Sequence, residues 1–228
     1  MAALDDHLPG GGLARGGLHE IEGERAEWDD GAATGFCLAL LARLVSAGRI
    51  LWVSRWGDLH GPGLAAYGLD PGRLILVRAE TEAAVLWALE EGLRCPALDA
   101  VVGEIDGLER SAGRRLQLAA EASGVSALLL RRRLRPAGRS EPPSAALTRW
   151  RVAPLGRAET SGGTWPRPLG RAGWRVELRR CRGAAPGTWL LEWDDAAGGF
   201  ALAAPVRDRP AAPAGAPADT PSVRRATG

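Results

Sequence analysis

Residues 73–105 read RLILVRAETEAAVLWALEEGLRCPALDAVVGEI, and this stretch decides the fold class. It contains two apolar runs, Leu74–Val77 and Ala100–Ile105, each with the length and composition of a buried strand. Between them, residues 80–94 carry apolar side chains at helical spacing, and Pro96 ends the predicted helix. A strand, a helix and a second strand in this order are typical of a β-α-β unit, so we expect a parallel sheet.

The same alternation continues on both sides of this stretch. The further predicted strands are Leu18–Ile21, Ile50–Ser54 and Val125–Leu130, and the further predicted helices are Ala32–Ala47, Leu59–Leu69 and Ser111–Ser123. Gly48 and Gly124 stand just behind two of these helices, where glycine commonly ends a helix. The predicted fold class is therefore α/β, with a mostly parallel sheet flanked by helices on both faces.

The pattern changes after residue 145. Residues 147–155 and 174–181 alternate between apolar and polar side chains, and residues 188–193 follow the turn signal Ala185-Pro186-Gly187. We therefore expect a C-terminal β-hairpin that is antiparallel to the main sheet. Residues 1–17 form a Gly-rich N-terminal lead-in, and residues 18–206 form the predicted domain. Residues 207–228 contain four prolines and form a tail that we expect to be disordered alone.

The basic residues of this chain are all arginine. The 228 residues include 29 basic ones and no lysine, and the net charge is only +2. Without lysine the chain can have no P-loop lysine, no Schiff base and no lysine general base. Attraction to nucleic acid must come from a local cluster of arginines, because the overall charge is low.

Cysteine and histidine are too sparse to predict a metal site. No metal-ligand spacing is found among the three cysteines and three histidines, which are Cys37, Cys95, Cys181, His7, His19 and His60. No apolar run reaches the roughly 18 residues of a membrane helix, and the N-terminus lacks a signal-peptide pattern. We expect a cytoplasmic protein with reduced thiols, no metal and no membrane contact.

A cluster of arginines follows the predicted strand Val125–Leu130. It consists of Arg131, Arg132, Arg133, Arg135 and Arg139, opposed only by Glu141 before two prolines. Guanidinium groups pair with phosphates and stack on bases, so this loop is the candidate contact for single-stranded DNA, with modest affinity. The alternative is a solvated charge run that binds nothing.

The order of the predicted elements resembles a RecA-type core. The chain resembles the ImuA family more closely, a family of RecA-like and SulA-like accessory proteins of bacterial damage-induced mutagenesis. The resemblance covers about residues 8–202. It is carried by the strings LPGGGL (8–13), LHE (18–20), GLDP (68–71), LILVRA (74–79), LWALEE (86–91), LRCPAL (93–98), RLQLAAE (115–121), TRWRV (148–152) and EWDD (192–195).

The resemblance places residues 23–31 at the position of the phosphate loop of a P-loop NTPase fold, and this Walker A position is degenerate. The loop from Gly23 to Gly31 holds Glu24, three more carboxylates, Arg25 and no lysine, so a polyphosphate there meets net repulsion. Thr34 is either a leftover Mg²⁺-binding hydroxyl or, as we expect, the start of the next helix.

A second acidic residue belongs to the same comparison. Glu104 ends a later strand at the Walker-B-like position, where the alternative is an N-cap or a salt-bridge partner at the strand end. We expect no bound cofactor and no catalysis. Trp28 and Trp56 fall on loops that face this site. We expect them to be buried against the chain's own core, with a plug or a protein interface as the alternatives.

The resemblance implies a non-catalytic accessory protein in SOS-induced, error-prone translesion DNA synthesis. Its implied partners are an ImuB-type protein, which is an inactive homologue of the Y-family polymerases, and an error-prone replicative-type DNA polymerase. RecA is a further candidate partner. Two alternatives stay open: a SulA-like inhibitor of cell division, which would bind FtsZ, and a weak DNA-stimulated ATPase.

Overall fold

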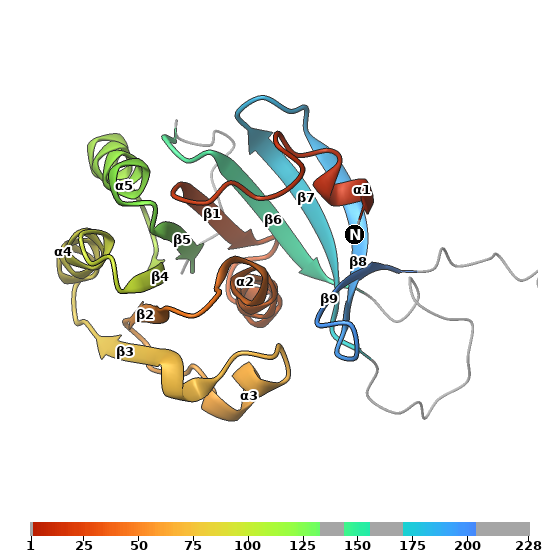
Figure 1. The fold of residues 1–228 in the computed structure, drawn as a ribbon, viewed down its shortest axis with the longest axis horizontal. Coiled ribbons are helices and arrows are strands. Elements are labelled where there is room, and N and C mark those ends of the chain that lie inside the picture. Colours follow the sequence, from red (N-terminus) through yellow and green to blue (C-terminus); the bar gives the residue numbers. More distant parts are fainter. Residues whose placement is uncertain (1, 133–143, 156–170, 204–228) are drawn as a thin grey trace, which may run out of the picture.

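The computed structural model describes residues 2–132, 144–155 and 171–203. Its central element is one nine-stranded sheet (Figure 1). The strands are β1 (Leu18–Gly23), β2 (Arg49–Ser54), β3 (Leu74–Arg78), β4 (Leu98–Ile105), β5 (Ser126–Arg131), β6 (Thr148–Pro154), β7 (Gly173–Cys181), β8 (Gly187–Asp194) and β9 (Gly199–Leu202). The helices are α1 (Ala2–Asp5), α2 (Asp30–Leu44), α3 (Gly61–Ala65), α4 (Glu82–Leu93) and α5 (Arg110–Ser123), with a 3₁₀ turn at Pro71–Arg73. The predicted tail, residues 207–228, lies outside the described residues.

The strand order is β3-β2-β4-β5-β1-β6-β7-β8-β9. All pairings from β3 to β6 are parallel, and those from β6 to β9 are antiparallel. The predicted α/β class, the mostly parallel sheet and the C-terminal antiparallel strands are therefore confirmed. The hairpin is β7–β8, which extends the main sheet through β6, and β9 is an additional strand that the sequence pattern did not indicate.

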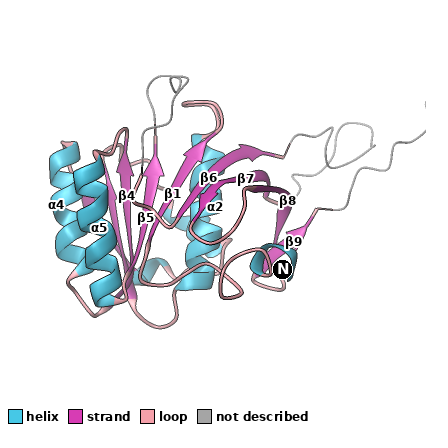
Figure 2. Cartoon of the chain, turned by 90° about the horizontal axis from the view of Figure 1, so that it is seen from above, coloured by secondary structure: helices cyan, strands magenta, loops and turns pink. Residues whose placement is uncertain are grey.

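Helices cover both faces of the parallel part of the sheet. In Figures 1 and 2, α4 and α5 lie together on one face and α2 lies on the other. Alternate residues of β5 serve the two faces: Leu128 and Leu130 pack in the α2 core, whereas Ala127 and Leu129 pack in the α4–α5 core. The continuous apolar runs follow from this arrangement, because both faces of each such strand are buried.

Aromatic side chains fill the space between α2 and the antiparallel strands. Phe36 of α2 lies within 6.0 Å, centroid to centroid, of Trp150, Trp174 and Phe200. Trp193 packs on Tyr67 at 5.4 Å and donates its Nε1–H to the Ala66 carbonyl oxygen at 3.0 Å. The indole hydrogen bond allows a large apolar surface to be buried without an unsatisfied donor.

Two predicted features differ from the structure. The strand at Leu74–Val77 was expected in the buried interior, but β3 is an edge strand whose Ile75 and Leu76 are 39% and 50% exposed. The predicted helix Leu59–Leu69 is only the short α3, since glycines at 61, 63 and 68 and Pro62 weaken helix propagation there.

The Gly-rich lead-in packs on the domain, with Leu4 and Leu8 buried in the α2 core.

A fully buried histidine lies on β1. One ring nitrogen of His19, Nδ1, is 2.8 Å from the Thr148 hydroxyl, and Nε2 is 2.9 Å from the Ala14 carbonyl oxygen. Burial lowers the pKa of His19 from its ordinary value of 6.5 to about 4, although the contact with Ala14 acts in the opposite direction. The imidazole is therefore neutral in the folded protein near pH 7, and it joins the lead-in to β6.

We predict that acid destabilises the fold through His19. The unfolded chain binds a proton on this residue at a higher pH than the folded chain, so the free energy of unfolding falls as the pH drops below 6.5 and levels off below about 4. Between pH 7 and pH 5 this amounts to about 2 kcal/mol, measurable by urea denaturation. His19→Gln should abolish this loss of unfolding free energy between pH 7 and pH 5, whereas His60→Gln, at an exposed histidine, should retain it. The same pH dependence of the unfolding free energy in both variants would contradict the assignment to His19.

Candidate functional site at the carboxyl edge of the sheet

The parallel strands end at one edge of the sheet, and those residues predicted as functional that the structure describes gather there. In Figure 2 the arrowheads of β1, β4 and β5 all point to this edge. Ligand sites of open α/β sheets lie at such an edge, where loops and helix starts meet. The structure brings the loop after β1, Glu104 at the end of β4, and Arg131 and Arg132 at the end of β5 to this place.

The loop between β1 and α2 is folded onto the carboxylate of Asp29. This carboxylate accepts hydrogen bonds from the Arg25 backbone N–H at 3.0 Å, from Nε at 3.1 Å and from Nη2 at 2.7 Å. Its side chain has no exposed surface. Burial opposes the charged form, but the hydrogen bonds from Arg25 outweigh it and hold the pKa of Asp29 below its ordinary value. The backbone N–H of Arg25 thus donates to the Asp29 carboxylate and is not free to donate to a phosphate.

The backbone of Asp29 approaches Gly23 so closely that only glycine fits at this first position of the loop. A Cβ on Gly23 would lie 3.0 Å from the Asp29 carbonyl carbon and 3.2 Å from its oxygen. The loop backbone therefore folds back directly over the end of β1. Gly31, by contrast, lies in the first turn of α2 with open space around it.

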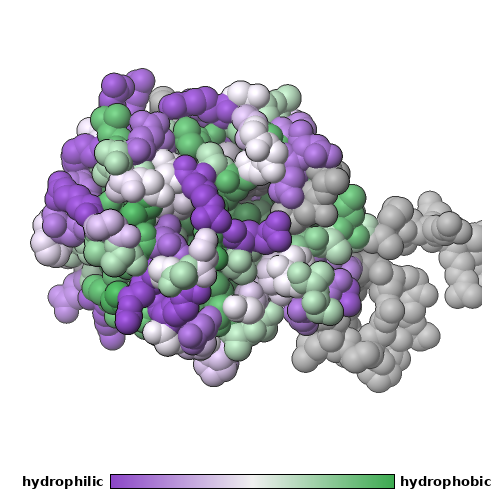
Figure 3. Space-filling view, in the orientation of Figure 1, coloured by the Kyte–Doolittle hydropathy of each residue, from purple (hydrophilic) through white to green (hydrophobic). Residues whose placement is uncertain are grey.

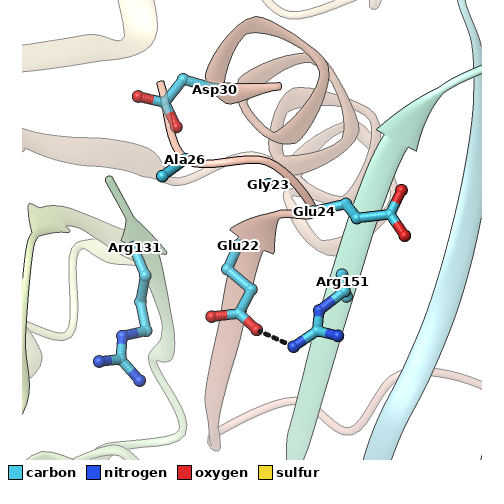
Figure 4. Close-up of a pocket in the computed structure, with 7 residues that line it drawn as sticks. All are labelled: Glu22, Gly23, Glu24, Ala26, Asp30, Arg131 and Arg151. Carbon is cyan, nitrogen blue, oxygen red and sulfur yellow. Dashed lines mark hydrogen bonds and ion pairs between the residues drawn. The ribbon is translucent and has the colours of Figure 1, made fainter. Parts of the chain in front are cut away.

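Arginines from β6 and β7 pair with two further acids near this loop. Glu24 forms an ion pair with Arg175, and Glu22 pairs with Arg151 at 3.3 Å. Figure 4 shows Glu22 between Arg131 on one side and Arg151 on the other. The cavity that these residues line has a volume of about 20 Å³, which is room for about one water molecule.

Arg132 connects three carboxylates from three different elements. It binds Asp58 in a bidentate manner at 2.8 Å, Asp30 at 3.2 Å and Glu104 at 3.3 Å. Its guanidinium carbon also lies 4.7 Å from the centroid of the Trp56 ring. Burial disfavours the Arg132 cation, but its hydrogen bond to Asp58 and the nearby Glu104 outweigh burial and raise the pKa of this guanidinium. The Asp58 carboxyl has a lowered pKa because Arg132 donates to it.

Glu104 is a buried salt-bridge partner at the end of β4. It is 1% exposed, and its Oε1 accepts the Trp52 indole N–H at 2.7 Å while its Oε2 accepts the Ser54 hydroxyl at 2.8 Å and Arg132. The alternative of a strand-end salt bridge is therefore the arrangement observed, and both carboxylate oxygens are occupied. In the described part of the chain, no group of three or more His, Cys, Asp or Glu could hold a metal ion.

The arginine cluster predicted to contact DNA divides into two parts. Arg131 was expected in a loop, but β5 runs through it; the residue is 6% exposed and lies 3.5 Å from Glu20. Arg132 is held by the three carboxylates named above. Arg133, Arg135 and Arg139 lie outside the described residues, so their contact with DNA stays a prediction.

Two further expectations at this site were wrong. Thr34 does not start its helix, because α2 begins four residues earlier at Asp30, and the Thr34 hydroxyl donates to the Asp30 carbonyl oxygen at 2.8 Å. Trp28 is 82% exposed rather than buried, whereas Trp56 is half-buried beneath Arg132. The role of Asp58 was missed; the signal was its position shortly after a buried strand, at the edge where neighbouring strands also end.

No protein-family model matches this chain. Two curated proteins do match it, both called Protein ImuA and both from strains of Caulobacter vibrioides. Each is 39% identical to this chain over 220 residues, a match that covers 93% of this chain and 90% of the relative. In the described part of the chain, no helix is both long and apolar enough to span a membrane.

We predict that Arg132→Met destabilises the fold by about 3 kcal/mol, because it leaves the buried Glu104 carboxylate without its cation. Methionine keeps an unbranched apolar side chain but removes the guanidinium, and with it the contact of that group with the Trp56 ring. The matched control is Arg94→Met, which removes a pair with Glu91 between two exposed side chains and should cost less than about 1 kcal/mol. Urea denaturation measures both, and equal losses would contradict a central role for Arg132.

Proposed function

This chain belongs to the ImuA family, and on that premise we propose that it is a cytoplasmic, non-catalytic, RecA-like accessory protein. In this proposal it acts through protein contacts in SOS-induced, error-prone translesion DNA synthesis. Its partners are an ImuB-type inactive homologue of the Y-family polymerases and an error-prone replicative-type DNA polymerase, with RecA as a further candidate. Weak contact with single-stranded DNA through Arg133, Arg135 and Arg139 is part of the same proposal.

The element order supports the RecA-like part of this proposal. A Gly-rich lead-in is followed by β1, a loop, the long helix α2, further β-α units and closing antiparallel strands. This is the order that the resemblance to a RecA-type core implies. In this proposal the loop between β1 and α2 corresponds to the phosphate loop of that core.

One observation supports the non-catalytic part: four carboxylates at the carboxyl edge, those of Asp29, Asp30, Asp58 and Glu104, are already paired with arginines of the chain. Asp29 occupies the Arg25 backbone N–H of the loop, and Arg132 occupies Asp30, Asp58 and Glu104. A nucleotide would have to displace these contacts, and a carboxylate in the loop repels its phosphates. The chain also lacks the lysine that would neutralise the outer phosphates.

We predict that the purified chain releases no phosphate from saturating Mg·ATP above a protein-free blank, with or without single-stranded DNA. Mg·ATP at 1 mM should raise the melting temperature by less than about 1 °C, since a ligand that binds only above millimolar concentration adds little stability. RecA protein is the positive control. DNA-stimulated release that Gly23→Val abolishes would instead support the ATPase alternative, because a valine side chain cannot fit against the Asp29 backbone.

We predict that the full chain captures a purified ImuB-type protein of the same organism and does not capture FtsZ. Trp28→Ser should weaken this capture at least tenfold. Trp28 is exposed on the loop that the Arg25–Asp29 contacts hold in place, and tryptophan is enriched among the residues that dominate protein interfaces. The matched control is Trp87→Ser, at a tryptophan on α4 that is 67% exposed, and this variant should leave the capture unchanged. Capture of FtsZ alone would favour the inhibitor of cell division.

A further inference from the structure

A groove with a volume of about 550 Å³ lies between α4 and α5 at the carboxyl edge of the sheet. Figure 2 shows these two helices side by side on one face of the sheet. The apolar wall of the groove consists of Ala83 and Leu86 on α4, Leu108 on the loop after β4, and Ala112 on α5. On the face of the molecule drawn in Figure 3, by comparison, small apolar areas are intermixed with hydrophilic residues. The groove shares only Arg131 with the small cavity beside β1, so it is a separate site.

Two carboxylates line the groove, and neither forms an ion pair in the part of the chain that the structure describes. Glu82 is held in place, because its Oε1 accepts the backbone N–H groups of Asp106 at 2.6 Å and of Gly107 at 3.1 Å. Glu109 precedes α5 without capping it, and its carboxylate has one long contact, 3.5 Å from the Ser111 hydroxyl. The groove therefore offers one carboxylate that is already oriented and a second one that can turn toward a ligand.

The two arginines at the groove already have acidic partners elsewhere. Arg115 of α5 pairs with Glu90 of α4 at 2.8 Å, and Arg131 pairs with Glu20 of β1 at 3.5 Å. Neither of these two acids lines the groove. Arg110 begins α5 and does not line the groove either. The charge that remains available to a ligand inside the groove is therefore negative.

We propose that this groove binds a short segment of another protein in which a basic residue stands beside an aliphatic one. The aliphatic side chain packs against Leu86 and Leu108, and the cation pairs with Glu82 and Glu109. Burial of the aliphatic side chain drives the association, and the ion pairs select the partner by its charge. This inference goes beyond the proposed function, because it assigns a second contact surface and the chemistry that this surface recognises.

Other classes of ligand fit the groove less well. Nucleic acid is disfavoured, because its phosphates would face Glu82 and Glu109. A metal ion is disfavoured too, since the described residues include no group of three or more His, Cys, Asp or Glu that could hold one. Sites for small molecules enclose most of their ligand, whereas this groove is open to solvent. A side chain that a larger partner presents does not need such enclosure.

Synthetic peptides and the purified full chain test this binding. The probes are the fluorescently labelled peptides GSRLGS and GSLRGS, and matched peptides replace the arginine by glutamate or the leucine by serine. We expect a dissociation constant on the order of 100 µM for the better probe, because a short flexible peptide loses conformational entropy on binding. The matched peptides should bind at least tenfold more weakly. Fluorescence anisotropy measures all of them at chain concentrations up to about 1 mM.

Removing one charge tests whether the probe occupies this groove. Glu82→Gln keeps an acceptor for the N–H groups of Asp106 and Gly107 but removes the negative charge, so it should weaken binding of the probe at least fivefold. The matched control is Glu91→Gln, at an exposed acid of the same helix that does not line the groove, and it should leave binding unchanged. Circular dichroism melting of both variants verifies that they are folded.

Filling the groove tests the apolar contact independently of charge. Ala83→Trp places a large side chain in the groove from an exposed position on α4, so it should abolish binding of the probe. The matched control is Ala122→Trp, at an exposed alanine near the other end of α5, and it should leave binding unchanged.

Three outcomes would overturn the proposal. The first is that neither probe binds at a chain concentration of about 1 mM. The second is that Glu82→Gln and Ala83→Trp both bind the probe as the unchanged chain does. The third is that replacing residues 133–135, which read Arg-Leu-Arg, by serines tightens binding at least tenfold, since the groove would then belong to this chain itself. None of these measurements uses the ImuB-type protein or a nucleotide, so this proposal and the proposed function can fail separately.

Discussion

The carboxyl edge of this sheet depends on the ion pairs that Arg132 forms with three carboxylates. It joins the start of α2, the loop after β2 and the end of β4 through Asp30, Asp58 and Glu104. Charges taken out of water are costly unless they are paired and hydrogen-bonded, and Glu104 is almost fully buried. Arginine suits this position better than lysine, because a planar guanidinium can bind Asp58 in a bidentate manner and stack on Trp56.

Most of the acids at this edge are paired with arginines of the same chain, and this pairing is the basis of our proposal that the chain does not hydrolyse a nucleotide. In a nucleotide site, backbone N–H groups, a lysine and a metal ion receive the phosphates. In this chain, Asp29 accepts a hydrogen bond from the backbone of the loop after β1, and Arg132 lies among Asp30, Asp58 and Glu104. A site whose polar groups are paired internally has little free energy to gain from a ligand.

The sequence predicted best where hydrophobic periodicity alone determines the structure. The parallel half has continuous apolar runs because helices cover both faces, and the antiparallel half alternates because only one face is buried, as Trp174, Val176 and Leu178 show. Periodicity reports which faces of a strand are covered but not whether it has a second neighbour, and this is why β3 was misplaced. The four residues of β9 are too short for any period to appear.

The arginines at the end of β5 could not be interpreted from local sequence, because their partners are distant along the chain. Arg131 lies beside Glu20, and Arg132 meets Asp58, so a charge run that looks solvated lies partly inside the protein. The signal that was available is the common edge at which parallel strands end, since it brings together acids and bases from separate β-α units.

The charged part of the core lies where the two halves of the sheet meet. β1 is the last strand between parallel neighbours, and Glu20 on it is buried between Arg131 of β5 and Arg149 of β6, at 3.5 and 3.0 Å. Ser144 also donates to Glu20. Helix α5 packs mainly on β1 and β5, so at the margin of this cover the face needs groups that are apolar along their length and polar at the tip. Arginine stems provide that, and the Glu20 carboxylate between them forms an ion pair with both guanidinium groups. The transition from a two-faced to a one-faced sheet is therefore made with ion pairs, and the same choice of arginine recurs at the carboxyl edge.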